Sequence, residues 1–214
     1  MKTMSGIQEG PLPELKPVLK KWILISNEYV HRSQGNDASW WFNERASLST
    51  VSAATWLAKG IAVEEYTTTK RLIPDKGKPK KSDRGRCDLY ISVRSGKRDH
   101  YFVIEAKPCW PDLTSTRYPG EIAAGIEAAR EDVRHTNAEE SRRLGLLLVS
   151  PVIPKGAERN TETLLEGFIE EIRSHEDCAV AWTFPGEARR LYSKKHREYY
   201  PGAAILIKPL RLTR

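Results

Sequence analysis

The sequence predicts an α/β protein in which a mixed central sheet is flanked by helices. Four segments repeat apolar residues every three or four positions, as amphipathic helices do. Several shorter segments alternate apolar and polar residues or run continuously apolar, as strands do. The two kinds of segment interleave along 214 residues, of which 39% are hydrophobic and 29% charged. A chain of this length and composition can bury a sizeable core.

Two helices are expected in the first part of the chain. Over 14–31 the apolar side chains return at helical spacing, and Pro17 suits a first helical turn. A polar break follows, and a second helix is expected over 39–59, where Gly60 is a typical C-terminal stop.

Three strands and a third helix are expected next. The segment 61–69 resembles a strand, and 87–94 and 100–107 resemble two further strands joined by a short turn. Proline and glycine residues within 70–86 predict a flexible loop between the first two strands. An amphipathic helix is expected over 120–137.

The remaining elements follow from the same patterns. The continuous apolar run over 144–150 predicts a strand covered on both faces. A helix is expected over 161–174, and strands over 178–184 and 203–208. The length fits a single domain over 1–214. Its expected parts are a core at about 39–150, an N-terminal helical extension over 1–38 and a C-terminal α/β extension over 151–214.

The positive charge of the chain is concentrated in two segments. The formal net charge is +7, and residues 70–86 and 189–214 together carry +13, whereas the rest carries −6. A basic loop and a basic tail on a mildly acidic body indicate a polyanionic partner, of which nucleic acid is the first choice. The alternative is a solvated loop and tail that keep the protein soluble.

Other features favour a cytoplasmic protein without a membrane partner. The apolar runs are far shorter than a membrane span, and the N-terminus lacks the apolar region of a signal peptide. Three widely spaced cysteines, Cys87, Cys109 and Cys178, form no zinc-ligand pattern and are expected to be reduced thiols.

Two neighbouring predicted strands bring two acids and a lysine close together. Asp88 lies in the first strand, and Glu105 and Lys107 share one face at the end of the second. If Gly96 and Lys97 are the central residues of a type II′ turn, Asp88 lies directly opposite Glu105. A slip of one residue would lose this pairing. On this pattern Asp88 faces away from the side shared by Cys87, Leu89, Ile91 and Val93.

Two carboxylates this close repel each other unless a cation neutralises them. Mg²⁺ prefers oxygen ligands and commonly binds one or two carboxylates together with substrate phosphates. Lys107 could hold a water molecule or stabilise developing charge on a phosphate. The alternative is a salt-bridged trio on an exposed sheet face. A functional role is favoured because the charges end the apolar strand segment 101–104, where unpaired charge is costly.

A further acid, Glu44, is expected on the buried side of the second helix. It lies three residues after Trp41 and four before Leu48, so it could assist a second metal ion or a bound water. The alternative is a first-turn acid favoured by the helix dipole. Trp40 and Trp41 could stack on unpaired bases, although core packing is the preferred interpretation.

These residues resemble the PD-(D/E)xK nuclease superfamily, which has the restriction-endonuclease-like fold. The resemblance rests on Asp88, the Glu105-Ala106-Lys107 motif and an upstream helix that bears Glu44, with Cys87 in place of the motif's proline. It implies a core of order α-β-β-β-α-β over about 39–150. It also implies that Asp88, Glu105 and the Ala106 carbonyl bind Mg²⁺, for which Mn²⁺ can substitute, with Glu44 assisting. Lys107 would position the attacking water. Five polar residues of the following helix stay open as a further contributor: Glu127, Arg130, Glu131, Arg134 and His135.

The resemblance implies a metal-dependent hydrolase of phosphodiester bonds, with DNA as the expected substrate and internal cleavage favoured over end trimming. The basic loop would hold the nucleic-acid backbone without reading sequence. The residues expected to do so are Lys70, Arg71, Lys76, Lys78, Lys80, Lys81, Arg84 and Arg86. The alternative is a non-catalytic module that binds nucleic acid or a partner on the same fold. A targeting subunit or a homodimer would supply the recognition element that the sequence lacks.

Overall fold

The computed structural model describes residues 2–71, 82–138 and 140–210. Seven strands form its main sheet: β1 (Met4–Gln8), β2 (Ile61–Arg71), β3 (Ser82–Ser95), β4 (Arg98–Cys109), β5 (Arg142–Val149), β7 (Ala179–Phe184) and β10 (Ala203–Pro209). Their order in space is β1-β7-β10-β5-β4-β3-β2. Only β4 and β5 run parallel, and the other neighbours are antiparallel. The predicted α/β class with a mixed central sheet is therefore confirmed.

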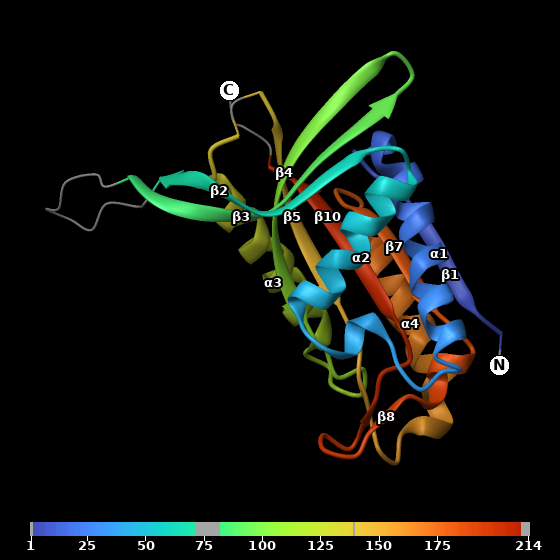
Figure 1. The fold of residues 1–214 in the computed structure, drawn as a ribbon. Helices are drawn as coiled ribbons and strands as arrows, with labels where there is room; N and C mark the ends of the chain where they lie inside the picture. Colours follow the sequence, from blue (N-terminus) through green and yellow to red (C-terminus); the bar gives the residue numbers. More distant parts are fainter. Residues whose placement is uncertain (1, 72–81, 139, 211–214) are drawn as a thin grey trace, which may run out of the picture.

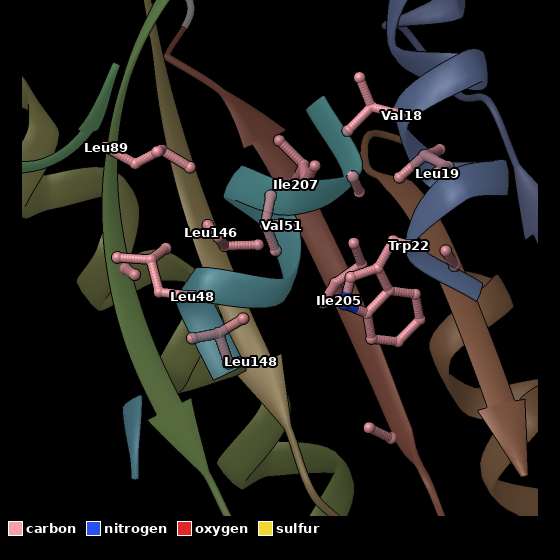
Figure 2. Packing of buried hydrophobic residues seen from close by; sticks show 14 of the residues in the cluster. Val18, Leu19, Trp22, Leu48, Val51, Leu89, Leu146, Leu148, Ile205 and Ile207 are labelled. Atoms are coloured by element: carbon pink, nitrogen blue, oxygen red, sulfur yellow. The ribbon is translucent and has the colours of Figure 1, made fainter. Parts of the chain in front are cut away.

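Helices cover both faces of this sheet (Figure 1). They are α1 (Lys16–Arg32), α2 (Glu44–Leu57), α3 (Tyr118–Arg134) and α4 (Thr161–Ser174). The first two pack on one face, where Trp22 and Val51 lie in one cluster with Leu146 (Figure 2). The other two pack on the opposite face, where Phe168 lies in one cluster with Leu147. Neighbouring residues of β5 thus enter different cores, which explains its continuous apolar run.

The described residues contain neither a membrane-spanning helix nor a disulfide bond. Within the described part of the chain, no helix is long and apolar enough to cross a membrane. Cys87, Cys109 and Cys178 are all free thiols, and Cys87 and Cys178 are buried.

The second helix begins later than predicted. The expected helix over 39–59 is divided into a 3-10 helix at Ser39–Trp41 and the α-helix α2. Asn43 precedes α2 in an extended conformation, and its side-chain oxygen accepts a hydrogen bond from the Ala46 N–H at 3.0 Å. This N-terminal cap fixes where the α-helix starts, because it satisfies a donor that has no partner inside the helix.

The two tryptophans before α2 belong to the core, as preferred from the sequence. Trp40 is buried, and its indole N–H donates to the Tyr200 carbonyl at 3.3 Å. Trp41 is half-buried and stacks on the Tyr200 ring with 5.5 Å between centroids. Both rings therefore take part in packing against the Tyr200 segment.

The two ends of the predicted basic loop belong to paired strands instead. The expected loop over 70–86 overlaps the end of β2 and the start of β3, whose backbones pair with Lys70 opposite Asp83 and Thr68 opposite Gly85. Cross-strand pairing has overridden the turn preference of Gly85 there. The hairpin extends away from the helices in Figure 1. Residues 72–81 lie outside the described part of the chain.

Four short strands were not predicted. Strand β1 pairs antiparallel with β7 at the sheet edge, so the expected helical extension over 1–38 also contributes a strand. A separate three-stranded sheet contains β6 (Ile153–Pro154), β8 (Tyr192–Ser193) and β9 (Glu198–Tyr199). Segments of two to five residues carry too little alternation to be recognised in the sequence.

The predicted turn between β3 and β4 is confirmed. Ser95 pairs with Arg98, and the same register continues to Leu89 opposite Ile104. Gly96 has a φ of +62°, whereas Lys97 is not among the residues with positive φ. This combination is typical of a type II′ turn, in which the first central residue is left-handed.

Replacing Gly96 with alanine is expected to lower the free energy of unfolding by about 1–2 kcal/mol, because a Cβ is unfavourable at this φ. No atom lies within 4 Å of the position a Cβ would take, so the cost is purely conformational. Gly167→Ala is the matched control, since Gly167 lies inside α4 and also faces open space. It should instead stabilise the protein by roughly 0.5–1 kcal/mol. Urea unfolding gives the free energy of unfolding of both variants. Equal changes in the two variants would contradict the conformational role assigned to Gly96.

Candidate active site

The ladder between β3 and β4 ends next to the predicted acids. One more step beyond Leu89 and Ile104 would set Asp88 opposite Glu105, but the paired register stops there. Instead, the Asp88 carboxylate turns toward β4 and accepts a hydrogen bond from the Ala106 N–H at 2.7 Å. A side-chain oxygen thus replaces the backbone carbonyl that would continue the ladder. The result places the Asp88 carboxylate against the backbone between Glu105 and Lys107.

The backbone is distorted around Asp88 on the β2 side as well. Leu89 and Cys87 both pair with β2, but Asp88, which lies between them, does not pair with Glu65. The backbone φ of Glu65 is +49°. Cys87 lies in a cluster with Val103 on the α3 side, whereas Leu89 packs on the α1–α2 side. The expectation that Cys87 and Leu89 share a face is therefore wrong, because the alternation of the strand is broken at Asp88.

Glu105 is a buried carboxylate rather than part of an exposed sheet face. Its residue is 2% exposed, and one carboxylate oxygen accepts a hydrogen bond from the Thr136 hydroxyl at 2.6 Å. Thr136 follows α3 and is itself 1% exposed. Because a buried charge is costly unless it is paired or hydrogen-bonded, this contact is part of what holds Glu105 in place. An exposed salt-bridged trio does not describe this arrangement.

Lys107 reaches a carboxylate that the sequence did not single out. Its ammonium group forms an ion pair with Asp132 of α3. Partial burial opposes the charged form, but Asp132, Asp88 and Glu44 outweigh it and raise the pKa of Lys107 above its usual value. Lys107 is therefore a protonated ammonium at neutral pH. It can donate hydrogen bonds and stabilise negative charge, but it cannot take a proton from water.

Glu44 stands at the first position of α2 and is half-buried. Burial and the negative charge of Asp88 raise the pKa of Glu44, whereas Lys107 acts in the opposite direction. Glu44, Asp88 and Lys107 are therefore close enough for each charge to affect the others. The first-turn position also fits the alternative interpretation, in which the helix dipole favours an acid there.

The polar residues proposed from the third helix mostly pair with one another or with the neighbouring strand. Glu127 contacts Arg130 and Lys208, each at 2.6 Å, and Glu131 contacts Arg134 and His135 at 3.1 Å and 3.5 Å. The helix end instead contributes Asp132 and Thr136 to the site. In the predicted helix over 120–137 their spacing of four residues would place them on one side, and this was the available signal, although Thr136 lies just beyond the end of α3.

The predicted nucleic-acid contacts are placed only in part. Arg86 is exposed on β3 and forms an ion pair with Glu65 at 2.9 Å. Lys70, Arg71 and Arg84 lie in the hairpin strands that lead to Asp88. Lys76, Lys78, Lys80 and Lys81 lie outside the described residues. In the C-terminal basic segment, Arg189 is buried, and β10 lies between β5 and β7 in the sheet. The described part of that segment, 189–210, therefore belongs to the folded body, and four of its basic residues are exposed: Arg190, Lys194, Lys195 and Arg197.

The oxygen atoms at the ladder break fit a hard divalent cation. Across the described ranges, no three His, Cys, Asp or Glu side chains already form a metal-binding group. The donors include carboxylates of Asp88 and Glu105 and a backbone carbonyl. Because the N–H and C=O of a strand residue point to the same side, the Ala106 carbonyl faces the gap beside Asp88. Oxygen donors of this kind suit Mg²⁺ or Mn²⁺.

A comparison of the chain with protein-family models, with curated proteins and with solved structures found no match. The interpretation of the site therefore depends on its geometry and chemistry.

Replacing Thr136 with valine is expected to destabilise the protein by about 1–3 kcal/mol. Valine has nearly the same shape but removes the hydroxyl that donates to the buried Glu105 carboxylate. Thr67→Val is the control, because Thr67 is exposed on β2 and should change the free energy of unfolding by no more than roughly 0.5 kcal/mol. Chemical denaturation compares the two variants. Wild-type stability in Thr136→Val would show that the contact does not hold Glu105.

Proposed function

We propose that this chain is a metal-dependent nuclease that hydrolyses phosphodiester bonds, with DNA as the expected substrate. The observation that carries the proposal is the contact of the Asp88 carboxylate with the Ala106 amide, between Glu105 and Lys107. It brings an acid of one strand to the Glu-x-Lys segment of the next. The charges of Glu44 and Asp88 also act on each other and on Lys107.

The order of elements around the site supports the same proposal. Helix α2, the three antiparallel strands β2, β3 and β4, helix α3 and the parallel strand β5 follow one another along the chain. This is the α-β-β-β-α-β order that the resemblance to PD-(D/E)xK nucleases implies. The restriction-endonuclease-like fold is thus part of the proposal, and the additional strands β7 and β10 extend its sheet.

The proposed chemistry is the attack of water on a phosphodiester, which forms one P–O bond and breaks the bond to the leaving sugar oxygen. The proton that the water loses passes to the solvent, and the leaving oxygen takes up a proton to become a sugar hydroxyl. A bound Mg²⁺ would neutralise phosphate charge and lower the pKa of a bound water. Asp88, Glu105 and the Ala106 carbonyl would hold it, with Glu44 assisting. The Lys107 ammonium would donate to the attacking water or to a phosphate oxygen. Asp132 keeps Lys107 protonated and in position, and the Thr136 hydroxyl donates to the Glu105 carboxylate and helps to hold it in position.

The basic hairpin would hold the nucleic-acid backbone beside this chemistry. Its strands carry Lys70, Arg71, Arg84 and Arg86, and β3 continues directly from Arg86 to Asp88. Contacts of this kind with phosphates supply affinity that falls with salt concentration and does not depend on sequence.

Incubation with supercoiled plasmid and with linear single- and double-stranded DNA and RNA tests the proposal. Each substrate is offered with Mg²⁺, with Mn²⁺ and with EDTA. We expect cleavage that requires the metal and stops in EDTA. If no substrate is cut with either metal, the nuclease proposal fails. Binding of nucleic acid without cleavage would then favour the alternative, a non-catalytic binding module.

A further inference from the structure

An open cleft of about 600 Å³ lies on the same side of the sheet as α3. Its floor contains one tyrosine from each of three adjacent strands: Tyr66 of β2, Tyr90 of β3 and Tyr101 of β4. Its wall is formed by the segment that follows α3, including Asn137 and Ala138. The nuclease chemistry proposed above uses none of these residues.

The three tyrosine side chains are all partly exposed to solvent. Tyr101 is 41% exposed, and Tyr66 and Tyr90 are half-buried. The Tyr66 and Tyr90 rings meet edge to face, with 6.1 Å between their centroids. Three aromatic side chains thus line one concave surface, which is the kind of platform on which planar ligands stack.

The cleft adjoins the candidate active site. Tyr101, Val103 and Glu105 alternate along β4 and so share one face, and four residues of strand span about 13 Å. On the other side, Asn137 follows Thr136, whose hydroxyl bonds to Glu105. Burial is the main reason that the pKa of Tyr66 is raised, the neighbouring Cys87 thiol is the next, and the charge of Glu105 makes a smaller contribution. A strand whose phosphate lies at Asp88 and Glu105 could therefore place a nearby base in the cleft.

We propose that the tyrosine cleft, formed by Tyr66, Tyr90 and Tyr101, binds an unpaired base of the strand that is cut. The inference rests on the proposed nuclease function and names its substrate class: nucleic acid with a single-stranded segment next to the scissile phosphate. The volume suits a nucleotide-sized ligand. Stacking on aromatic rings accepts every base, since each has a π face, so the cleft selects strandedness rather than sequence.

Fluorescence anisotropy with a labelled 12-nucleotide single-stranded DNA and with a blunt duplex of the same sequence tests this inference in EDTA. We expect Tyr90→Ala and Tyr101→Ala each to weaken binding of the single strand by about 5- to 150-fold, the range that corresponds to loss of one stacked base. Duplex binding should change by less than twofold. Tyr101→Phe keeps the ring and should bind the single strand as the wild type does.

Tyr29→Ala is the matched control, because Tyr29 is 37% exposed on α1, which packs on the opposite face of the sheet. It should leave binding of both DNAs unchanged. Thermal melting of every variant shows whether the fold is retained, and Tyr101 is exposed enough that its truncation should be tolerated. The inference is overturned if the tyrosine variants bind the single strand as the wild type does, or if they lose both DNAs equally.

The design separates this inference from the proposed function, because binding in EDTA requires no catalysis. If binding of the single strand depends on the tyrosines but no metal-dependent cleavage occurs, the proposed nuclease activity fails, whereas the proposed binding of an unpaired base in the tyrosine cleft stands. If metal-dependent cleavage occurs but binding of the single strand does not depend on the tyrosines, the nuclease proposal stands and the tyrosine-cleft proposal fails.

Discussion

Replacing Asp88 with asparagine is expected to reduce metal-dependent cleavage by a factor on the order of 100 or more, without unfolding the protein. Asparagine keeps a side-chain oxygen that can accept the hydrogen bond from the Ala106 N–H. It removes the negative charge that would hold the metal. Stability and catalysis are thereby separated at a single position, which an alanine substitution would not achieve.

The matched control for this variant is Asp99→Asn. Asp99 is an exposed acid near the β3–β4 turn, and its carboxylate lies 3.9 Å from Arg94. The substitution removes the same charge from the same hairpin and should leave cleavage unchanged. Initial rates on the preferred substrate, with thermal melting as the folding check, measure both. Full activity in a folded Asp88→Asn protein would show that the Asp88 carboxylate does not take part in cleavage.

The second large effect is expected for Lys107→Met, which should also lose about 100-fold or more in cleavage rate while binding metal as the wild type does. Methionine keeps an unbranched apolar side chain but lacks the ammonium that Asp132, Asp88 and Glu44 hold in its charged form. Because Lys107 is not an expected ligand, the metal should still bind.

Lys97→Met is the control for that substitution, since Lys97 is exposed in the turn between β3 and β4. It should alter neither cleavage nor metal affinity. Parallel measurements of rate and of metal binding distinguish the possible roles of Lys107. Loss of metal binding in Lys107→Met would make it a structural residue, and an unchanged rate would exclude it from catalysis.

The parts of the fold that were predictable depend on local pattern. A glycine at the first central position of a turn fixes the β3–β4 register, so the pairing down to Leu89 and Ile104 followed from Gly96. Helix α4 begins and ends as its amphipathic spacing predicts. By contrast, β1 is a five-residue edge strand, and the continuation of β3 into the basic segment depends on pairing with β2. Such long-range pairing leaves little trace in local sequence.

The residues of the candidate site likewise divide into those that a local sequence pattern predicts and those that depend on long-range contacts. Glu105 and Lys107 stood out because they end an apolar strand. The turn register indicated that Asp88 lies near them, although its predicted pairing directly opposite Glu105 is wrong. The break in the ladder at Asp88 could not be read from the sequence, because it depends on one side chain outcompeting a backbone carbonyl. Asp132 and Thr136 were missed because only the packing of α3 against β4 shows which residues of the helix end reach the site.

The central claim is that the ladder break at Asp88 is a metal site. Isothermal titration of Mn²⁺ into the wild type, Asp88→Asn and Asp99→Asn tests it without any substrate. We expect saturable binding of Mn²⁺ to the wild type and to Asp99→Asn, and loss of that binding in Asp88→Asn. Equal binding by all three proteins, or no binding by the wild type, would contradict the claim.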